Sequence, residues 1–232
     1  MKLILFDIDG TLLWTDGAGR RAVGAALRDE TGSTGPIDTY RLDGKTDPLI
    51  VRELLELSGH PDPADPRRIA SVCERYVLRL EEELRDNNNA RLLAGVPELL
   101  RALEPVEREG RAMVGLLTGN LERGAVLKLR AAGLDPARFR VGAYGSDSGV
   151  RSDLPAIAAQ RAGRLVSREF PGASVVILGD TPADVECGRP IGARAIGVAT
   201  GHYDVAALQR AGAAAVLADL ADTVAALEAI LA

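Results

Sequence analysis

The side chains best suited to chemistry follow an apolar run near the start of the chain. Leu3–Phe6 leads directly into Asp7-Ile8-Asp9-Gly10-Thr11. Two carboxylates this close in sequence repel each other and resist ionising together unless a cation or a shared proton relieves the repulsion. Gly10 lets the chain turn sharply, and Thr11 offers a hydroxyl. The plain alternative is a polar turn, because Asp, Gly and Thr are ordinary turn residues.

A second acidic pair follows a later apolar run, in Gly179-Asp180-Thr181-Pro182-Ala183-Asp184. Asp180 ends the predicted strand and Asp184 lies one helical turn further on, so both can face one crevice. Taken alone, this segment could be a capped helix start. Together with Asp7 and Asp9 it predicts a cluster of carboxylates that needs a hard divalent cation, most naturally Mg²⁺.

Two further segments could bind an oxyanion. Thr118 carries a hydroxyl at another strand end, and the amides of Gly119 and Asn120 can approach an anion at the start of a helix. Arg151 is the only basic residue between positions 141 and 160. Its guanidinium could neutralise a phosphate and brace a carboxylate, although a solvated surface arginine is the alternative.

The segment Gly44-Lys45-Thr46-Asp47 resembles the end of a phosphate-binding P-loop. The first glycine of that motif is replaced by Thr39, and no apolar strand precedes it, so nucleotide triphosphate binding is disfavoured. We interpret the segment as a loop that faces the site, with Lys45 as a candidate substrate contact. A solvated lysine in a polar loop is an equally good interpretation.

Short apolar runs that alternate with amphipathic spacing predict the elements that position these residues. The predicted strands are Leu3–Phe6, Ala112–Leu117, Ser174–Leu178, Arg194–Val198 and Ala214–Leu217. The predicted helices between them are Leu121–Ala132, Leu154–Arg164, Ala183–Arg189 and Val205–Ala211, with a last helix that ends at Leu231 and takes Asp219 as its N-cap. This order predicts an α/β fold with a doubly wound, mostly parallel sheet, which binds ligands at the carboxyl ends of its strands.

The alternation is interrupted over residues 15–89. Ala18–Glu30, Leu49–Ser58 and Ile69–Leu84 show helical spacing, separated by loops rich in Gly and Pro. We therefore expect a core domain made of residues 1–14 and 90–232, with an all-helical domain inserted at 15–89.

Composition excludes several classes of protein. The 232 residues are 47% hydrophobic and 26% charged, which favours a folded core over disorder. A net charge of −5 and only 3% aromatic residues argue against a nucleic-acid binder. No apolar run is long enough to span a membrane, and no signal peptide is evident. The two cysteines, Cys73 and Cys187, indicate reduced thiols in a cytoplasmic protein.

In this order the motifs resemble those of the haloacid dehalogenase (HAD) superfamily: Asp7-Ile8-Asp9-Gly10-Thr11, then Thr118, Arg151 and Gly179-Asp180…Asp184. The chain looks most similar to the phosphoglycolate phosphatase-like branch, whose helical C1 cap is inserted where residues 15–89 lie. The resemblance implies a HAD-like Rossmannoid core. Many relatives carry Lys where this chain has Arg151, whose planar fork differs in geometry.

The resemblance also implies roles. Asp7 is expected to be the nucleophile that forms an aspartyl-phosphate, and Asp9 the general acid and base. Mg²⁺ is expected between the Asp7 carboxylate, the Asp9 backbone carbonyl, Asp180 and a phosphate oxygen, with Asp184 as a direct or supporting ligand. Arg151 is the expected catalytic cation. The residues expected around phosphate are Gly10, Thr11, Thr118, Gly119 and Asn120, with Lys45 as a further candidate.

These inferences predict a Mg²⁺-dependent phosphatase of small phosphorylated metabolites, such as phosphoglycolate or a sugar phosphate, acting as a monomer or homodimer. The name-giving dehalogenases are disfavoured, because they lack the second acid, Asp9. A phosphosugar mutase of the β-phosphoglucomutase type is the enzymatic alternative. A non-catalytic protein that binds a phosphorylated metabolite is the alternative of a different class.

Overall fold

Six parallel strands form the central sheet of the computed structural model, which describes residues 1–232. In sheet order they are β5 (Val141–Ala143), β4 (Ala112–Leu117), β1 (Lys2–Phe6), β6 (Val175–Gly179), β7 (Arg194–Val198) and β8 (Ala215–Leu217). All neighbouring pairs are parallel, which confirms the predicted α/β fold. The short strand β5 was not predicted from the sequence.

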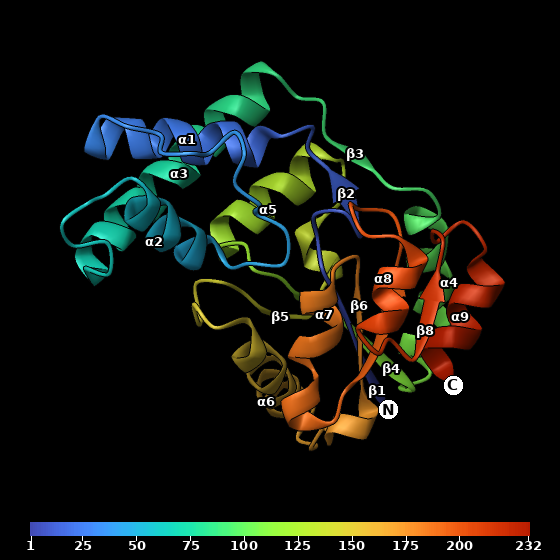
Figure 1. Ribbon diagram of the computed structural model, residues 1–232. Helices are drawn as coiled ribbons and strands as arrows, with labels where there is room; N and C mark the ends of the chain where they lie inside the picture. The colour runs from blue at the N-terminus through green and yellow to red at the C-terminus, as the bar shows by residue number, and fades with distance from the viewer.

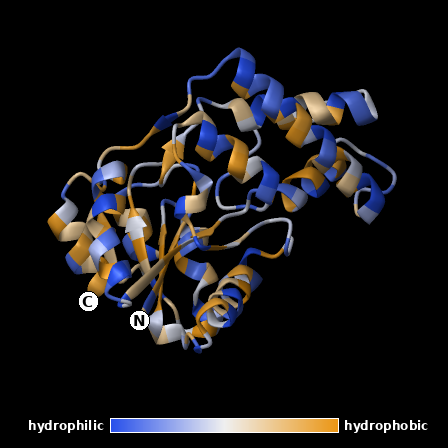
Figure 2. Ribbon diagram, turned by 180° about the vertical axis from the view of Figure 1, so that it is seen from behind, coloured by the Kyte–Doolittle hydropathy of each residue, from blue (hydrophilic) through white to orange (hydrophobic).

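Helices cover both faces of this sheet (Figure 1). Alternate residues of β1 show why: Ile4 and Phe6 belong to one buried apolar cluster, and Leu3 and Leu5 to another. The first cluster is covered by α4 (Val96–Arg108), α5 (Glu122–Ala131) and α9 (Thr223–Leu231). The second is covered mainly by α6 (Leu154–Val166), with α7 (Pro182–Cys187) at its edge, while α8 (Val205–Arg210) packs on β7 and β8. Figure 2 shows the resulting apolar strands in orange inside largely polar helix surfaces.

Three helices interrupt the α/β order, as the spacing predicts: α1 (Ala18–Thr31), α2 (Asp47–Leu57) and α3 (Pro66–Asp86). We call these helices and their loops the helical insert. They enclose an apolar cluster of their own, which also contacts Leu121 and Leu127 beside and within α5. The side chain of Thr46 caps α2 and that of Asp65 caps α3, each before a proline in the first turn.

A two-stranded antiparallel ladder marks the points where the chain enters and leaves the helical insert. It pairs β2 (Leu13–Trp14) with β3 (Arg91–Leu92). The sequence does not predict this ladder, because strands of two residues are too short to show an alternating pattern. It ties the two connections of the helical insert together.

One predicted cap is wrong. The last helix begins at Thr223, and its N-cap is Asp222, whose carboxylate accepts a hydrogen bond from the Ala225 amide. Asp219 instead accepts from the Ala221 amide in the preceding turn. The buried side chain of Leu220 fixes that turn, so the helix starts later than the position of the first aspartate suggests.

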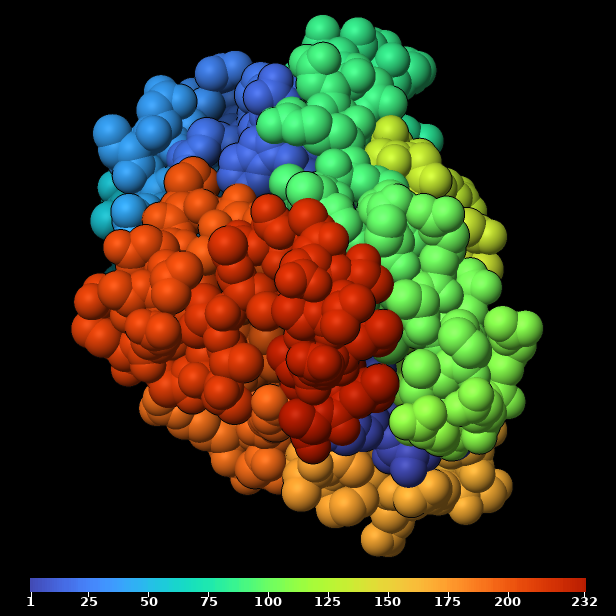
Figure 3. Space-filling model, turned by 90° about the vertical axis from the view of Figure 1, so that its right-hand side faces the viewer, coloured from blue at the N-terminus to red at the C-terminus, as the bar shows by residue number.

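The topology brings the site residues together. Strand β1 lies between β4 and β6, so the carboxyl ends of these three strands are neighbours. The strand order reverses at this point, which is where open parallel sheets bind ligands. The helical insert lies beside this edge (Figure 1), and in Figure 3 its blue atoms lie above the orange and red C-terminal residues. No helix is both long and apolar enough to cross a membrane.

Candidate active site

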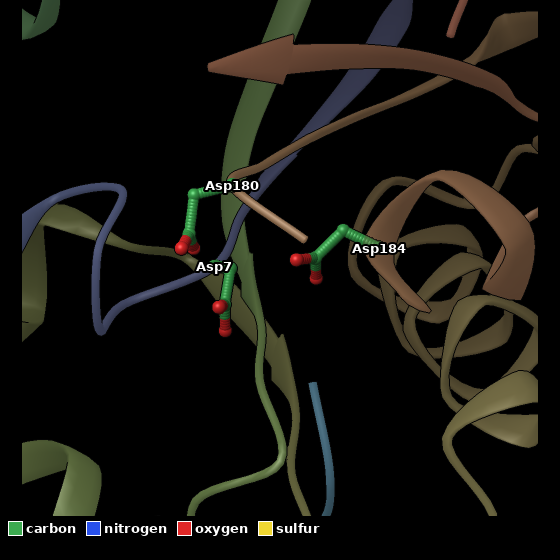
Figure 4. A group of neighbouring side chains, drawn as sticks. All are labelled: Asp7, Asp180 and Asp184. Atoms are coloured by element: carbon green, nitrogen blue, oxygen red, sulfur yellow. The ribbon is translucent and has the colours of Figure 1, made fainter. Parts of the chain in front are cut away.

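Three buried carboxylates converge at the carboxyl edge of the sheet (Figure 4). Asp7 follows β1, Asp180 follows β6, and Asp184 lies in the first turn of α7. One oxygen from each side chain can be chosen so that all three lie within 4.8 Å of one another. The residues are only 6%, 4% and 1% exposed, respectively. The two acidic motifs predicted to share a crevice therefore do so.

Local structure holds Asp184 in place. Thr181 and Asp184 form a reciprocal capping box at the start of α7, in which Asp184 Oδ2 accepts from the Thr181 amide at 3.0 Å and from its hydroxyl at 2.6 Å. The other oxygen of Asp184 pairs with Arg151, whose Nη2 also lies 3.2 Å from Asp7 Oδ1. Arg151 thus links two of the three carboxylates.

The electrostatics of the cluster favour a bound cation. Burial, then repulsion by Asp184, raises the pKa of Asp7 to about 7 although Arg151 lowers it. Burial and the charges of Asp184 and Asp7 raise the pKa of Asp180 to about 9. Although burial lowers the pKa of Arg151, Asp184 and Asp7 raise it above its ordinary value. One arginine does not balance three carboxylates, and their oxygen-only donor set suits a hard divalent ion.

The turn after β1 packs against Asp180. Gly10 has φ +81°, and a Cβ atom there would lie 2.4 Å from Asp180 Oδ2, so no other residue fits this position without displacing the carboxylate. The buried hydroxyl of Thr11 donates to Asp180 Oδ1 at 3.2 Å. In this structure the side chain of Thr11 therefore positions Asp180.

The loop after β4 presents donors beside Asp7. The Thr118 oxygen accepts from the Asn120 side-chain amide at 2.8 Å and from its backbone amide at 3.4 Å, which leaves the Thr118 hydroxyl proton free to donate. The Gly119 amide donates to no group of the protein. A Cβ at Gly119 would lie 2.0 Å from the Lys45 carbonyl oxygen, so the helical insert crosses this loop backbone to backbone.

Lys128 is a site residue that the sequence analysis missed. Its ammonium lies 2.6 Å from Asp9 Oδ2 and 2.6 Å from Asn120 Oδ1. The sequence does offer one indication of this role. Lys128 lies on the apolar face of the predicted helix, with the buried residues Ala125 and Leu129. A lysine on such a face is rarely buried unless it is paired.

The helical insert supplies the opposite wall of a cavity of about 180 Å³, which is lined by Asp7, Asp9, Thr118 and Lys128 from the core. Lys45 also lines this cavity, but its ammonium pairs with Glu53 at 2.6 Å and with the Tyr40 hydroxyl at 2.7 Å.

Asp47, at the start of α2, joins the helical insert to the loop after β4. Its amide donates to the Gly119 carbonyl at 2.8 Å, and its carboxylate accepts from the Leu121 amide at 2.8 Å. Burial raises the pKa of Asp47 to about 6, although Lys128 and the Leu121 amide lower it.

The predicted residues thus occupy one region with different contacts. Asp7, Asp180, Asp184 and Arg151 form the buried cluster, whereas the Asp9 carboxylate turns toward Asn120 and Lys128. The Asn120 side-chain amide donates to Asp9 and to Thr118, so it supports both side chains.

Solved structures with the same fold include several bacterial enzymes. A hydrolase from Pseudomonas syringae aligns over 100% of both chains with a TM-score of 0.76 and 24% identity. CbbY from Rhodobacter sphaeroides, in complex with phosphate, aligns over 96% of both chains with a TM-score of 0.73 and 22% identity. A predicted phosphoglycolate phosphatase from Haemophilus somnus aligns over 97% of both chains with a TM-score of 0.69 and 19% identity. No curated protein matches the chain significantly.

The family model for haloacid dehalogenase-like hydrolases matches residues 4–189. This span begins in β1 and ends after α7, so it contains the strand-end carboxylates, the loop after β4 and Arg151. Since the match covers most of the 232 residues, this protein is an enzyme of the haloacid dehalogenase-like hydrolase family.

Proposed function

We propose that this enzyme is a Mg²⁺-dependent phosphatase that hydrolyses small phosphomonoesters through an aspartyl-phosphate on Asp7. The observation that carries the proposal is the placement of the Asp7 carboxylate. It lies beside two other buried carboxylates and Arg151, in a cavity also lined by Thr118 and Gly119. A nucleophilic carboxylate, a cation site and free donors are what displacement at an anionic phosphorus requires.

Asp7 attacks phosphorus, and the bond from phosphorus to the ester oxygen breaks as the aspartyl-phosphate forms. The Thr118 hydroxyl and the Gly119 amide donate to phosphate oxygens. Arg151 lines the cavity, so its guanidinium can also donate to a phosphate oxygen. The carboxylates of Asp7 and Asp180, with the Asp9 carbonyl and support from Asp184, would hold Mg²⁺, which offsets the negative charge of the phosphate.

Asp9 moves the proton in both steps. Its carboxyl group protonates the ester oxygen as that oxygen leaves, and then takes a proton from the water that attacks the aspartyl-phosphate. The second displacement frees Asp7 and releases inorganic phosphate. In Asp9, Oδ2 is held by Asn120 and Lys128, whereas no protein group bonds to Oδ1, which is therefore available for the proton.

We further propose that residues 15–89 act as a cap on a core made of 1–14 and 90–232. The cavity between them, about 180 Å³, suits a small phosphorylated metabolite such as phosphoglycolate or a sugar phosphate. Glu53 and the Tyr40 hydroxyl accept two of the three ammonium protons of Lys45, which leaves one to donate to the substrate. Both cysteines are buried and unpaired, which supports action in the cytoplasm.

The test is release of inorganic phosphate from a panel of phosphate esters, with Mg²⁺ and with EDTA. We expect turnover that EDTA abolishes and Mg²⁺ restores. Asp7→Asn should lower kcat by about 10³-fold or more, because it removes the nucleophile. Asp38→Asn is the matched control, since Asp38 is an exposed aspartate of the helical insert without a side-chain partner.

Three outcomes would contradict the proposal. Equal turnover by Asp7→Asn would remove the nucleophile assignment. Tight phosphate binding without hydrolysis of any ester would indicate a non-catalytic binding protein. Interconversion of sugar phosphate isomers that depends on a bisphosphate activator would indicate a mutase instead.

A further inference from the structure

Lys128 is one of only three lysines in the chain, and its ammonium is almost fully enclosed. Its side chain is 6% exposed, whereas the Asp9 carboxylate that it contacts is 37% exposed. A buried lysine is rarely tolerated unless its charge is paired, and here the pairing carboxylate lies on the cavity wall. The pair thus joins a rigid core helix to an accessible acidic group.

The contacts fix one edge of the Asp9 carboxylate. Oδ2 accepts from Lys128 at 2.6 Å and from the Asn120 side-chain amide at 2.8 Å. Lys128 also donates to Asn120 Oδ1 at 2.6 Å, so the three side chains form a closed triangle of hydrogen bonds. Because both donors bind the same oxygen, rotation of the carboxylate would break both bonds, and Oδ1 stays free.

Neighbouring elements hold Lys128 in turn. A Cβ atom at Gly19 of α1 would lie 3.6 Å from the ammonium and 3.7 Å from the Tyr76 hydroxyl of α3, so the ammonium is covered by the helical insert as well as by its own helix. Thr118 accepts from the same Asn120 amide that reaches Asp9. The triangle therefore connects the loop after β4, Asp9 and the helical insert.

We propose that Lys128 is a positioning residue for Asp9: with Asn120 it anchors Oδ2 so that Oδ1 faces the ester oxygen. The proposal rests on the proposed phosphatase function. In the first step the proton moves from Oδ1 to the ester oxygen as the bond to phosphorus breaks. In the second step Oδ1 takes a proton from water as the water oxygen bonds to phosphorus and the bond to Asp7 breaks.

The first test compares two leaving groups. An alkyl phosphate must be protonated as its alcohol leaves, whereas p-nitrophenolate is a stable anion that leaves without a proton. The comparison uses kcat/KM, which reports formation of the aspartyl-phosphate and not its hydrolysis, a step common to both substrates. Lys128→Met should therefore lower kcat/KM on the best alkyl phosphate of the panel by about 10- to 100-fold, a fraction of what a general acid supplies. On p-nitrophenyl phosphate we expect kcat/KM to fall by less than about threefold.

Arg130→Met is the matched control, because it removes an exposed cation from the same helix two residues away. If Lys128 were needed only for folding, Lys128→Met would lower kcat/KM for both substrates alike. If Lys128 contacted the phosphate, Lys128→Met would raise KM for both substrates and the inhibition constant of inorganic phosphate. Either result would overturn the proposal.

A double-mutant cycle gives a second test on the alkyl phosphate. In an Asp9→Asn background, Lys128→Met should cause almost no further loss, because the group that it positions is gone. Losses that multiply would show that Lys128 acts independently of Asp9. If Lys128→Met does not fold, Asn120→Ala removes the other donor to Oδ2 and should show the same dependence on the leaving group.

A third test observes the contact without activity. The three lysine ammonium groups can be resolved by ¹⁵N NMR and assigned by substitution. Asp9→Asn should shift the Lys128 signal and speed its exchange with water, while the Lys2 signal stays unchanged. An unchanged Lys128 signal would contradict the contact. If wild-type protein hydrolyses no ester, the proposed function fails, whereas activity with an unshifted ratio between the two leaving groups refutes only the role of Lys128.

Discussion

At the residue scale, the site is defined by charge that is crowded and buried. Asp7, Asp180 and Asp184 share one buried corner with a single guanidinium, that of Arg151. Repulsion among carboxylates is unfavourable in a buried site, so the arrangement makes sense when a cation completes it. Asp184 shows how local structure contributes. One of its oxygens accepts from Thr181, the N-cap of α7, while the other pairs with Arg151.

We predict that the stabilisation by Mg²⁺ grows with pH. The folded pKa values of Asp7, about 7, and Asp180, about 9, exceed the ordinary value of 3.8, so the metal-free folded protein binds more protons than the unfolded chain in this window. The two carboxyl groups therefore stabilise the metal-free fold at low pH, and this stabilisation is lost as pH rises through their pKa values in the folded protein. A divalent ion displaces the protons, so its stabilising effect is largest where deprotonation is easiest.

The measurement is Tm with and without Mg²⁺ at about pH 5.5 and about pH 8. We expect the larger increase at the higher pH for wild type and for Asp38→Asn. Asp180→Asn should flatten the difference. An increase in Tm that is the same at both pH values would argue against displacement of protons by the ion.

At the scale of elements, helix α2 contributes to the site through its first turn. Thr46 caps the helix and donates its hydroxyl to the Gly149 carbonyl at 2.8 Å, while Asp47 bonds to the loop after β4. The start of one helix therefore holds two backbone segments that are distant in sequence, the loop after β4 and the segment at Gly149. The glycine at 119 permits this close crossing, because any side chain there would meet the Lys45 carbonyl.

We predict that Asp47→Ala weakens inhibition by inorganic phosphate about tenfold, because losing one hydrogen bond to a buried amide costs about 1–2 kcal/mol. The Leu121 amide then lacks its acceptor, and the Thr118–Asn120 loop becomes less well ordered. Because burial raises the pKa of Asp47 to about 6, the wild-type inhibition should also weaken as pH falls below that value.

Glu56→Ala is the control for this experiment, since Glu56 is exposed on the same helix. The inhibition constant of phosphate, measured against any ester that the enzyme hydrolyses, is the readout. An inhibition constant for Asp47→Ala within error of the control would show that α2 does not support the loop after β4.

At the scale of the whole molecule, two apolar clusters on opposite faces of the sheet make the core, and a third makes the helical insert. The cavity lies between the helical insert and the sheet edge, and residues of both line it. Packing is thus separated from chemistry: the buried strands give a fixed base, and the helical insert lines the cavity opposite the sheet edge.

We predict a strong preference for small esters. A cavity of about 180 Å³ encloses a small metabolite but not a folded polypeptide. Free phosphoserine should be hydrolysed with a kcat/KM at least about 100-fold above that for phosphoserine within a peptide of ten residues. Comparable values for the two substrates would contradict an enclosing helical insert. If the enzyme hydrolyses sugar phosphates but neither phosphoserine substrate, we expect it to hydrolyse small sugar phosphates in preference to large ones.

The sequence by itself determined the order of five of the six strands of the sheet and of most helices, and the strand-end positions of Asp7 and Asp180. These features follow from local periodicity and from the rule that parallel strands share one ligand-binding edge. Only the tertiary structure decided that Lys128 meets Asp9 across 119 positions, and that Asp47 reaches Leu121 across 74. Such contacts depend on how helices pack over the sheet, and local spacing does not encode that packing.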